Sequence, residues 1–165
     1  MPDRADVERD ARRILADAYT GRSVTDDAVR WGALVLEAGI DAPSAAMLAA
    51  SERPTNWDET QPYFRAALAE VGIPVFDREA TLWTAVLDAA TAIVRGETEP
   101  RQGAEQISRC GIALDYPSEL MGLLYVDEII EQEEYCGLPA TPERWDAVVR
   151  AEAQDLLASM GRPGA

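Results

Sequence analysis

The sequence predicts an all-α protein, a single compact bundle of seven to eight helices around a central apolar helix at residues 77–95. Three observations predict this fold class. Apolar residues recur at intervals of three and four through most of the chain, the connections between these segments are short, and no stretch alternates apolar with polar residues as a half-buried strand would. The organisation resembles a bundle more than a solenoid, because the segments around Trp31, Trp57 and Trp83 match each other poorly.

The segment 77–95 is apolar around most of its circumference. On a helix, its polar residues after the first turn form one narrow stripe: Thr81, Thr84, Asp88, Thr91 and Arg95. A helix of this kind is usually enclosed by other helices. We therefore expect Leu87 and Ile93 to be almost fully buried and Asp88 to lie on the least covered side.

The remaining helices are bounded by capping and turn residues. Asp3, Thr25, Ser118 and Thr141 are typical N-cap residues, and Pro142 suits the first turn of the last helix. Gly21, Gly39 and Gly72 follow helical segments, as C-terminal glycines do. The predicted helices cover about residues 3–21, 25–39, 44–51, 58–71, 77–95, 100–110, 118–134 and 141–160.

The length of 165 residues suits one domain over residues 1–165, with frayed ends at 1–3 and 161–165. No apolar run approaches the roughly 20 residues that cross a bilayer, and the N-terminal residues lack the apolar core of a secretory signal. A cytoplasmic protein is the expectation. All 15 basic residues are arginine, a usage typical of GC-rich bacterial genomes.

The net charge of −15, from 30 acidic and 15 basic residues, limits the partners of this protein. Binding to a nucleic-acid backbone depends on cationic contacts, and so does binding to an anionic membrane surface. Both are therefore disfavoured. The charge favours a basic protein partner or cations, with ordinary solubility as the alternative explanation. Homo-oligomerisation is left open.

The chain contains no histidine, which removes Ser-His-Asp and Cys-His catalysis and histidine-containing metal sites. No glycine-rich phosphate loop follows a strand pattern. Cys110 and Cys136 are 26 residues apart and fit no zinc spacing, so we expect two small, reduced core residues. The sequence therefore predicts a non-enzymatic protein without catalytic residues, cofactor or metal ligands.

One span is strongly acidic and free of arginine. Between Arg109 and Arg144 there are eight acidic residues and no basic one. Asp127, Glu131 and Glu134 share a helix face, and like charges at this spacing repel by about 0.2–0.5 kcal/mol per pair. Nearby tyrosines are residue types that interfaces favour. The predicted partner-binding residues are Asp115, Glu119, Tyr125, Asp127, Glu128, Glu131, Glu134 and Tyr135.

Several interpretations of this acidic span remain. It is a solvated face without a partner, a contact surface for a basic protein, or a carboxylate site for calcium or magnesium in a metal-binding protein or metal-dependent enzyme. The metal interpretation lacks a loop of the Asp-x-Asp-x-Asp-Gly type. A nucleic-acid mimic would require acids at phosphate-like intervals along an elongated surface.

Parts of residues 25–110 resemble a loose group of small, acidic, all-helical bacterial proteins of the actinobacterial type. The resemblance rests on Trp31, residues 34–43, Leu48-Ala49, residues 67–73, residues 93–97 and Gly103-Ala104. These are helix and turn signals, so the resemblance implies a helical fold and no activity. In size and charge the chain is also similar to immunity and antidote proteins, which neutralise basic toxins. The predicted function is an immunity- or antitoxin-like module that presents its acidic surface to a basic protein partner, for instance a toxin.

Overall fold

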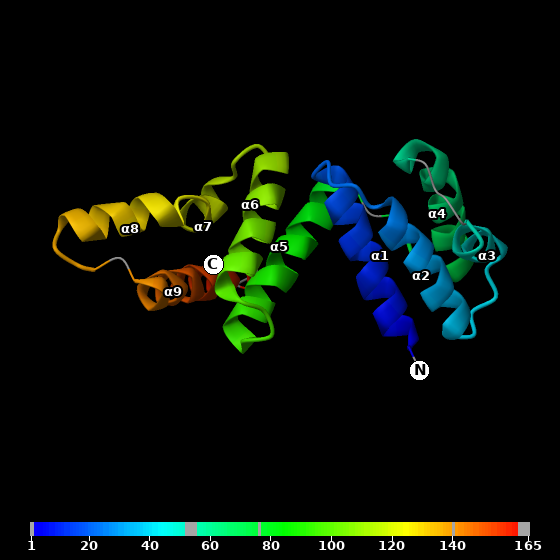
Figure 1. Ribbon diagram of the computed structural model, residues 1–165, viewed down its shortest axis with the longest axis horizontal. Helices are drawn as coiled ribbons and strands as arrows, with labels where there is room; N and C mark the ends of the chain where they lie inside the picture. The colour runs from blue at the N-terminus through cyan, green and yellow to red at the C-terminus, as the bar shows by residue number, and fades with distance from the viewer. Residues whose placement is uncertain (1, 52–55, 76, 140, 162–165) are drawn as a thin grey trace. The chain divides into compact units, whose positions relative to one another are not determined.

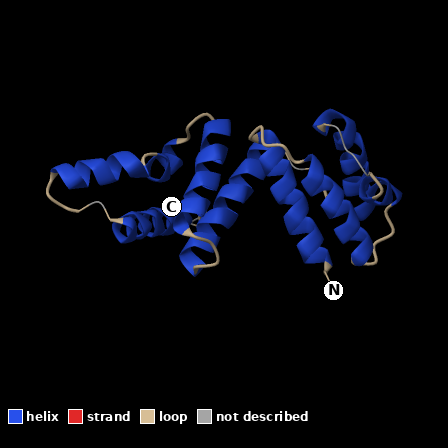
Figure 2. Cartoon of the chain, in the orientation of Figure 1, coloured by secondary structure: helices blue, strands red, loops and turns tan. Residues whose placement is uncertain are grey.

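The computed structural model describes residues 2–51, 56–75, 77–139 and 141–161, with the side chain of Asp127 excepted. Every regular element in these ranges is helical, as Figure 2 shows. The all-α prediction is confirmed. The elements are α1 (Arg4–Tyr19), α2 (Thr25–Glu37), α3 (Pro43–Ala49), α4 (Trp57–Val71), α5 (Arg78–Arg95), α6 (Pro100–Ala113), the 3₁₀ helix η1 (Ser118–Leu120), α7 (Met121–Leu124), α8 (Val126–Tyr135) and α9 (Pro142–Met160).

The chain divides into two compact units, Met1–Thr81 and Leu82–Ala165. The division falls inside α5, whose first turn is counted with the first unit. Of the ends that were expected to fray, Met1 and residues 162–165 lie outside the described residues, whereas Asp3 forms a capping box with Asp6 at the start of α1.

The first unit is built from α1 to α4, which lie next to one another and run from blue (α1) to blue-green (α4) in Figure 1. Their buried residues form one hydrophobic cluster that extends from Val7 to Ile73 and contains no residue of α5. Trp31 lies at its centre: its indole Nε1 donates to the Val7 carbonyl at 2.9 Å, and its ring meets Phe64 edge-on at 4.9 Å. One side chain thus joins α2 to α1 and α4.

In the second unit α5 packs through its buried residues Leu82, Val86 and Ile93. Gly103 of α6 lies against the Ile93 side chain with no room for a β-carbon, and Arg150 of α9 donates to the Ile93 carbonyl at 2.9 Å. Ile93 is fully buried and Asp88 is exposed, as expected, but Leu87 is only half-buried. The central position predicted for 77–95 is not confirmed, because the cluster of the first unit forms without it.

The prediction of seven to eight helices also differs from the nine α-helices and one 3₁₀ helix found in the described residues. The difference arises at 118–134, where one helix was expected. Ser118 makes no side-chain cap, and the backbone leaves the helical region at Tyr125, with φ −115° and ψ 30°. Gly122 supports a helix poorly, by about 0.5–1 kcal/mol relative to alanine. The segment therefore forms η1, the single turn α7 and then α8.

Candidate protein-binding surface

Helix α8 has one face packed within the second unit and one face directed outward. It contacts α9, and the two helices run side by side in Figure 1. The packed face carries Val126, Ile130 and Glu133, of which the two apolar residues are buried. At roughly 100° per residue, the opposite face carries Glu128, Glu131 and Tyr135. All three of these side chains are exposed, so the acidic residues point away from the core.

The structure brings only part of the predicted set together. Glu128, Glu131 and Tyr135 share the outer face of α8, and the exposed Glu134 flanks it. Asp115 and Glu119 are exposed on the connection after α6 and on η1, outside this face. The side chain of Asp127 lies outside the described residues. Together, Glu128, Glu131, Glu134 and Tyr135 form the α8 acidic face.

The two tyrosines of the predicted set differ in their exposure. Tyr135 is 94% exposed at the end of α8, and Tyr125 is 40% exposed at the break before it. The side chain of Tyr135 contributes little to the stability of the fold, because folding removes almost none of its apolar area from water. Tyr135 therefore lies beside the carboxylates as an accessible aromatic group.

Glu133 is one of the two acids of this span, with Glu143, that the predicted set does not contain. It receives two hydrogen bonds from Arg144 of α9, from Nε at 2.8 Å and from a terminal nitrogen at 2.6 Å. This bidentate hydrogen bonding lowers the pKa of Glu133 below its ordinary value and raises that of Arg144. The two residues are 11 apart, beyond helical spacing, and the turn around Gly137 brings them together. Among the described side chains, Glu128, Glu131 and Glu134 have no ion-pair partner of this kind.

Replacing Arg144 by glutamine is expected to raise the pKa of Glu133 toward its ordinary value of 4.5. Because the folded-state pKa is depressed, the pair stabilises the fold above the unfolded-state pKa, and this stabilisation is lost as pH falls through the folded-state value. A carbon-detected NMR titration of the glutamate carboxyl groups measures the change. Arg109→Gln removes the Glu105–Arg109 pair instead and serves as the matched control. An unchanged Glu133 titration in Arg144→Gln would contradict the assignment.

The sequence also led to predictions about the two cysteines, about metal ligands and about membrane-spanning segments. Cys110 is buried as expected, but Cys136 is exposed, because it is the C-cap residue that follows the last turn of α8 and not part of a packed helix face. Cys110 and Cys136 form no disulfide bond with each other. The described side chains contain no group of three or more Cys, Asp or Glu residues that could hold a metal ion. Within the described helices, none is long and apolar enough to span a membrane.

Comparisons of the chain with protein-family models, with curated proteins and with solved structures give no match. The α8 acidic face is therefore interpreted from its own geometry and charge.

Proposed function

We propose that this protein is a non-enzymatic binding module that presents the α8 acidic face to a basic protein partner. The observation that carries the proposal is the outward face of α8, where Glu128 and Glu131 stand beside the 94%-exposed Tyr135 in a span without arginine. Such a face matches the charge of a basic partner and offers it an aromatic contact.

The arrangement of charge in α8 supports this function over simple solubility. Glu131 and Glu134 lie in the last turns of the helix, where the dipole disfavours anions. Repulsion between like charges three or four residues apart adds about 0.2–0.5 kcal/mol per pair. Arginines placed among the acids would relieve this cost and keep the surface soluble, as they do in α1 at Arg4–Glu8 and Arg12–Glu8. A basic partner would relieve the same repulsion on binding.

The partner class is a protein with a cluster of arginine or lysine residues. A toxin that this chain neutralises is the partner favoured by its size and charge. Complementary charge would speed association and make it sensitive to salt, because the attraction between exposed charges is screened over about 8 Å at physiological ionic strength.

Charge reversal of the α8 acidic face tests the proposal. The triple variant Glu128→Arg, Glu131→Arg and Glu134→Arg should weaken binding of a fluorescent nona-arginine peptide at least about tenfold, since attraction becomes repulsion at the contact. Fluorescence anisotropy measures the affinity at low and at physiological salt. Wild-type affinity should fall as salt rises.

A matched control separates this face from the charge of the whole molecule. Glu37→Arg, Asp41→Arg and Asp88→Arg reverse three exposed acids elsewhere, so both triple variants carry a net charge of −9 instead of −15. The control should retain most of the wild-type affinity. Equal losses in the two variants would show that net charge alone attracts the peptide, and the proposal would fail.

A further inference from the structure

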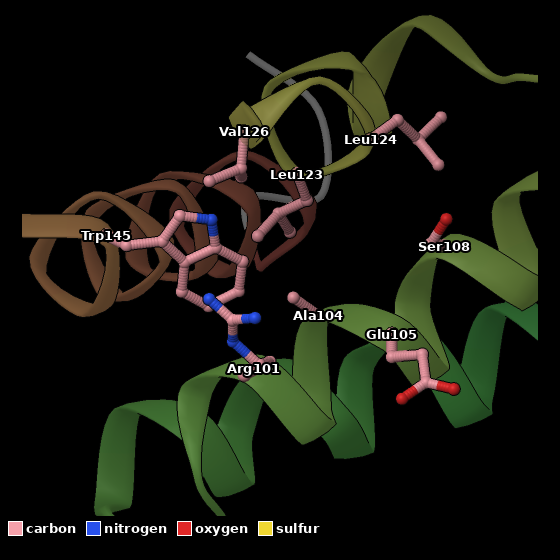
Figure 3. A pocket seen from close by; sticks show the side chains of 8 residues that line it. All are labelled: Arg101, Ala104, Glu105, Ser108, Leu123, Leu124, Val126 and Trp145. Carbon is pink, nitrogen blue, oxygen red and sulfur yellow. The ribbon is translucent and has the colours of Figure 1, made fainter. Parts of the chain in front are cut away.

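Helices α6, α7, α8 and α9 line an open pocket of about 340 Å³ within the unit Leu82–Ala165. This volume is at the lower end of the range of about 300–1,000 Å³ for small-molecule sites. The apolar part of its wall consists of Ala104, Leu123, Leu124 and Val126. Figure 3 shows Leu123 and Val126 directed toward the indole of Trp145, which supplies an aromatic surface. The pocket thus suits the apolar body of a small ligand.

A cation lies directly on this aromatic surface. The Cζ atom of Arg101, from the first turn of α6, is 4.9 Å from the centroid of the Trp145 ring, as Figure 3 illustrates. This distance is within the range of a cation–π contact. A guanidinium that stacks on a ring keeps its in-plane N–H groups for other acceptors. Trp145 therefore holds Arg101 at the pocket with donors available to a ligand.

The charges around the pocket leave Arg101 uncompensated among the described side chains. The other ionisable residue of the lining, Glu105, forms an ion pair with Arg109 at 2.9 Å. Figure 3 shows its carboxylate apart from the Arg101–Trp145 pair. Ser108, two turns after Arg101 on α6, adds a hydroxyl group at the other end of the lining. Arg101 is therefore the charge of the lining that remains for an anionic ligand, although the protein carries −15.

The α8 acidic face does not cancel this local charge. Val126 lines the pocket from the packed side of α8, whereas Glu128 and Glu131 lie on the opposite side of the helix. A helix with its side chains is about 10–12 Å across. The Debye length at physiological ionic strength is about 8 Å. A ligand in the pocket is therefore affected by Arg101 more than by those carboxylates.

We propose that this pocket binds a small planar aromatic carboxylate. The ring of the ligand packs against Trp145 and the side chains of Leu123 and Val126, and its carboxylate accepts hydrogen bonds from the guanidinium of Arg101. The site is separate from the α8 acidic face, so the ligand and a basic protein partner use different surfaces of the chain.

The test titrates naphthoate into the nitrogen-15-labelled full chain at physiological salt. The indole N–H resonance of Trp145, identified by its loss in Trp145→Phe, should shift saturably. The neutral amide, naphthamide, should bind at least about tenfold more weakly, because it lacks the charge that Arg101 recognises. Arg101→Gln should lower the naphthoate affinity to the level of naphthamide. Arg95→Gln, which removes an exposed arginine of the same unit, should leave it unchanged.

A second variant tests the pocket without removing a charge. Ser108→Leu fills the space beside Leu124 and should abolish binding of both compounds, with far-UV circular dichroism as the check on folding. The exposed Arg101 can be replaced without disturbing the core, so the charge test holds even where Ser108→Leu unfolds the chain. The proposal is overturned by a Trp145 resonance that does not move, or by equal affinities for naphthoate and naphthamide in the wild type.

Discussion

Truncation of Trp31 to alanine is expected to lower the free energy of unfolding by about 3–5 kcal/mol, the range for removing a large buried aromatic side chain. Trp31 is 2% exposed and belongs to the cluster formed by α1 to α4. Its loss removes the edge-on contact with Phe64 and the hydrogen bond to the Val7 carbonyl. The total free energy of unfolding of a small domain is about 5–15 kcal/mol, so this loss is a large fraction of it.

Urea denaturation followed by far-UV circular dichroism measures the loss. Trp57→Ala is the matched control, because Trp57 contacts the same Phe64, at 5.7 Å, but is only half-buried. Its truncation should cost less. Trp31→Phe keeps an aromatic ring and loses the hydrogen bond, so it should fall between the wild type and Trp31→Ala. A Trp31→Ala variant no less stable than Trp57→Ala would show that the ring is not the centre of this core.

Local signals in the sequence were sufficient for most helices. Thr141 and Pro142 predicted the start of α9, and the Thr141 side chain accepts a hydrogen bond from the Arg144 amide as an N-cap should. At α2 the prediction was one residue off, since Thr25 begins the helix and Val24 is the N-cap. The start of a helix depends on the residues of its first turn, so it can be predicted from the sequence alone.

Features that depend on packing between helices could not be predicted. The apolar circumference of 77–95 indicated enclosure, but its sequence cannot say which helices enclose it, and the cluster around Trp31 forms without α5. The break at Tyr125 follows the single turn α7, which contacts both α6 and α9, and the sequence around Ser118 does not reveal these contacts.

For the candidate surface too, the features within one helix could be predicted and the contacts between helices could not. Helical spacing places Glu128 and Glu131 on a common side of α8, and the structure leaves both exposed. The pairing of Glu133 with Arg144 and the stacking of Arg101 on Trp145 join residues of different helices. Neither pair has a sequence spacing that marks it. Glu133 therefore differs from the predicted Glu128 and Glu131, since its carboxylate is paired with Arg144 of α9.

Substitution of Gly32 by alanine is expected to destabilise the protein by about 1–3 kcal/mol, the usual cost of overpacking a core. Propensity alone predicts the opposite sign, because alanine in a helix interior is favoured over glycine by about 0.5–1 kcal/mol. The contact between α2 and α3 decides between these effects. A β-carbon at Gly32 would lie 2.7 Å from the Ala45 carbonyl oxygen, 2.9 Å from the Leu48 β-carbon and 3.0 Å from the Ala49 backbone nitrogen.

Two of these three atoms belong to the α3 backbone, so no side-chain rotation can make room and the two helices must separate. Gly32→Val should therefore cost more than Gly32→Ala. Ala46→Val is the control, because it adds similar volume at an exposed position of α3 and should cost only about the few tenths of a kcal/mol of helix propensity. Thermal and urea unfolding measure all three variants. If Gly32→Ala were instead more stable than the wild type, α2 and α3 would have room for a β-carbon at this position, and the close approach of the two helices would not require glycine.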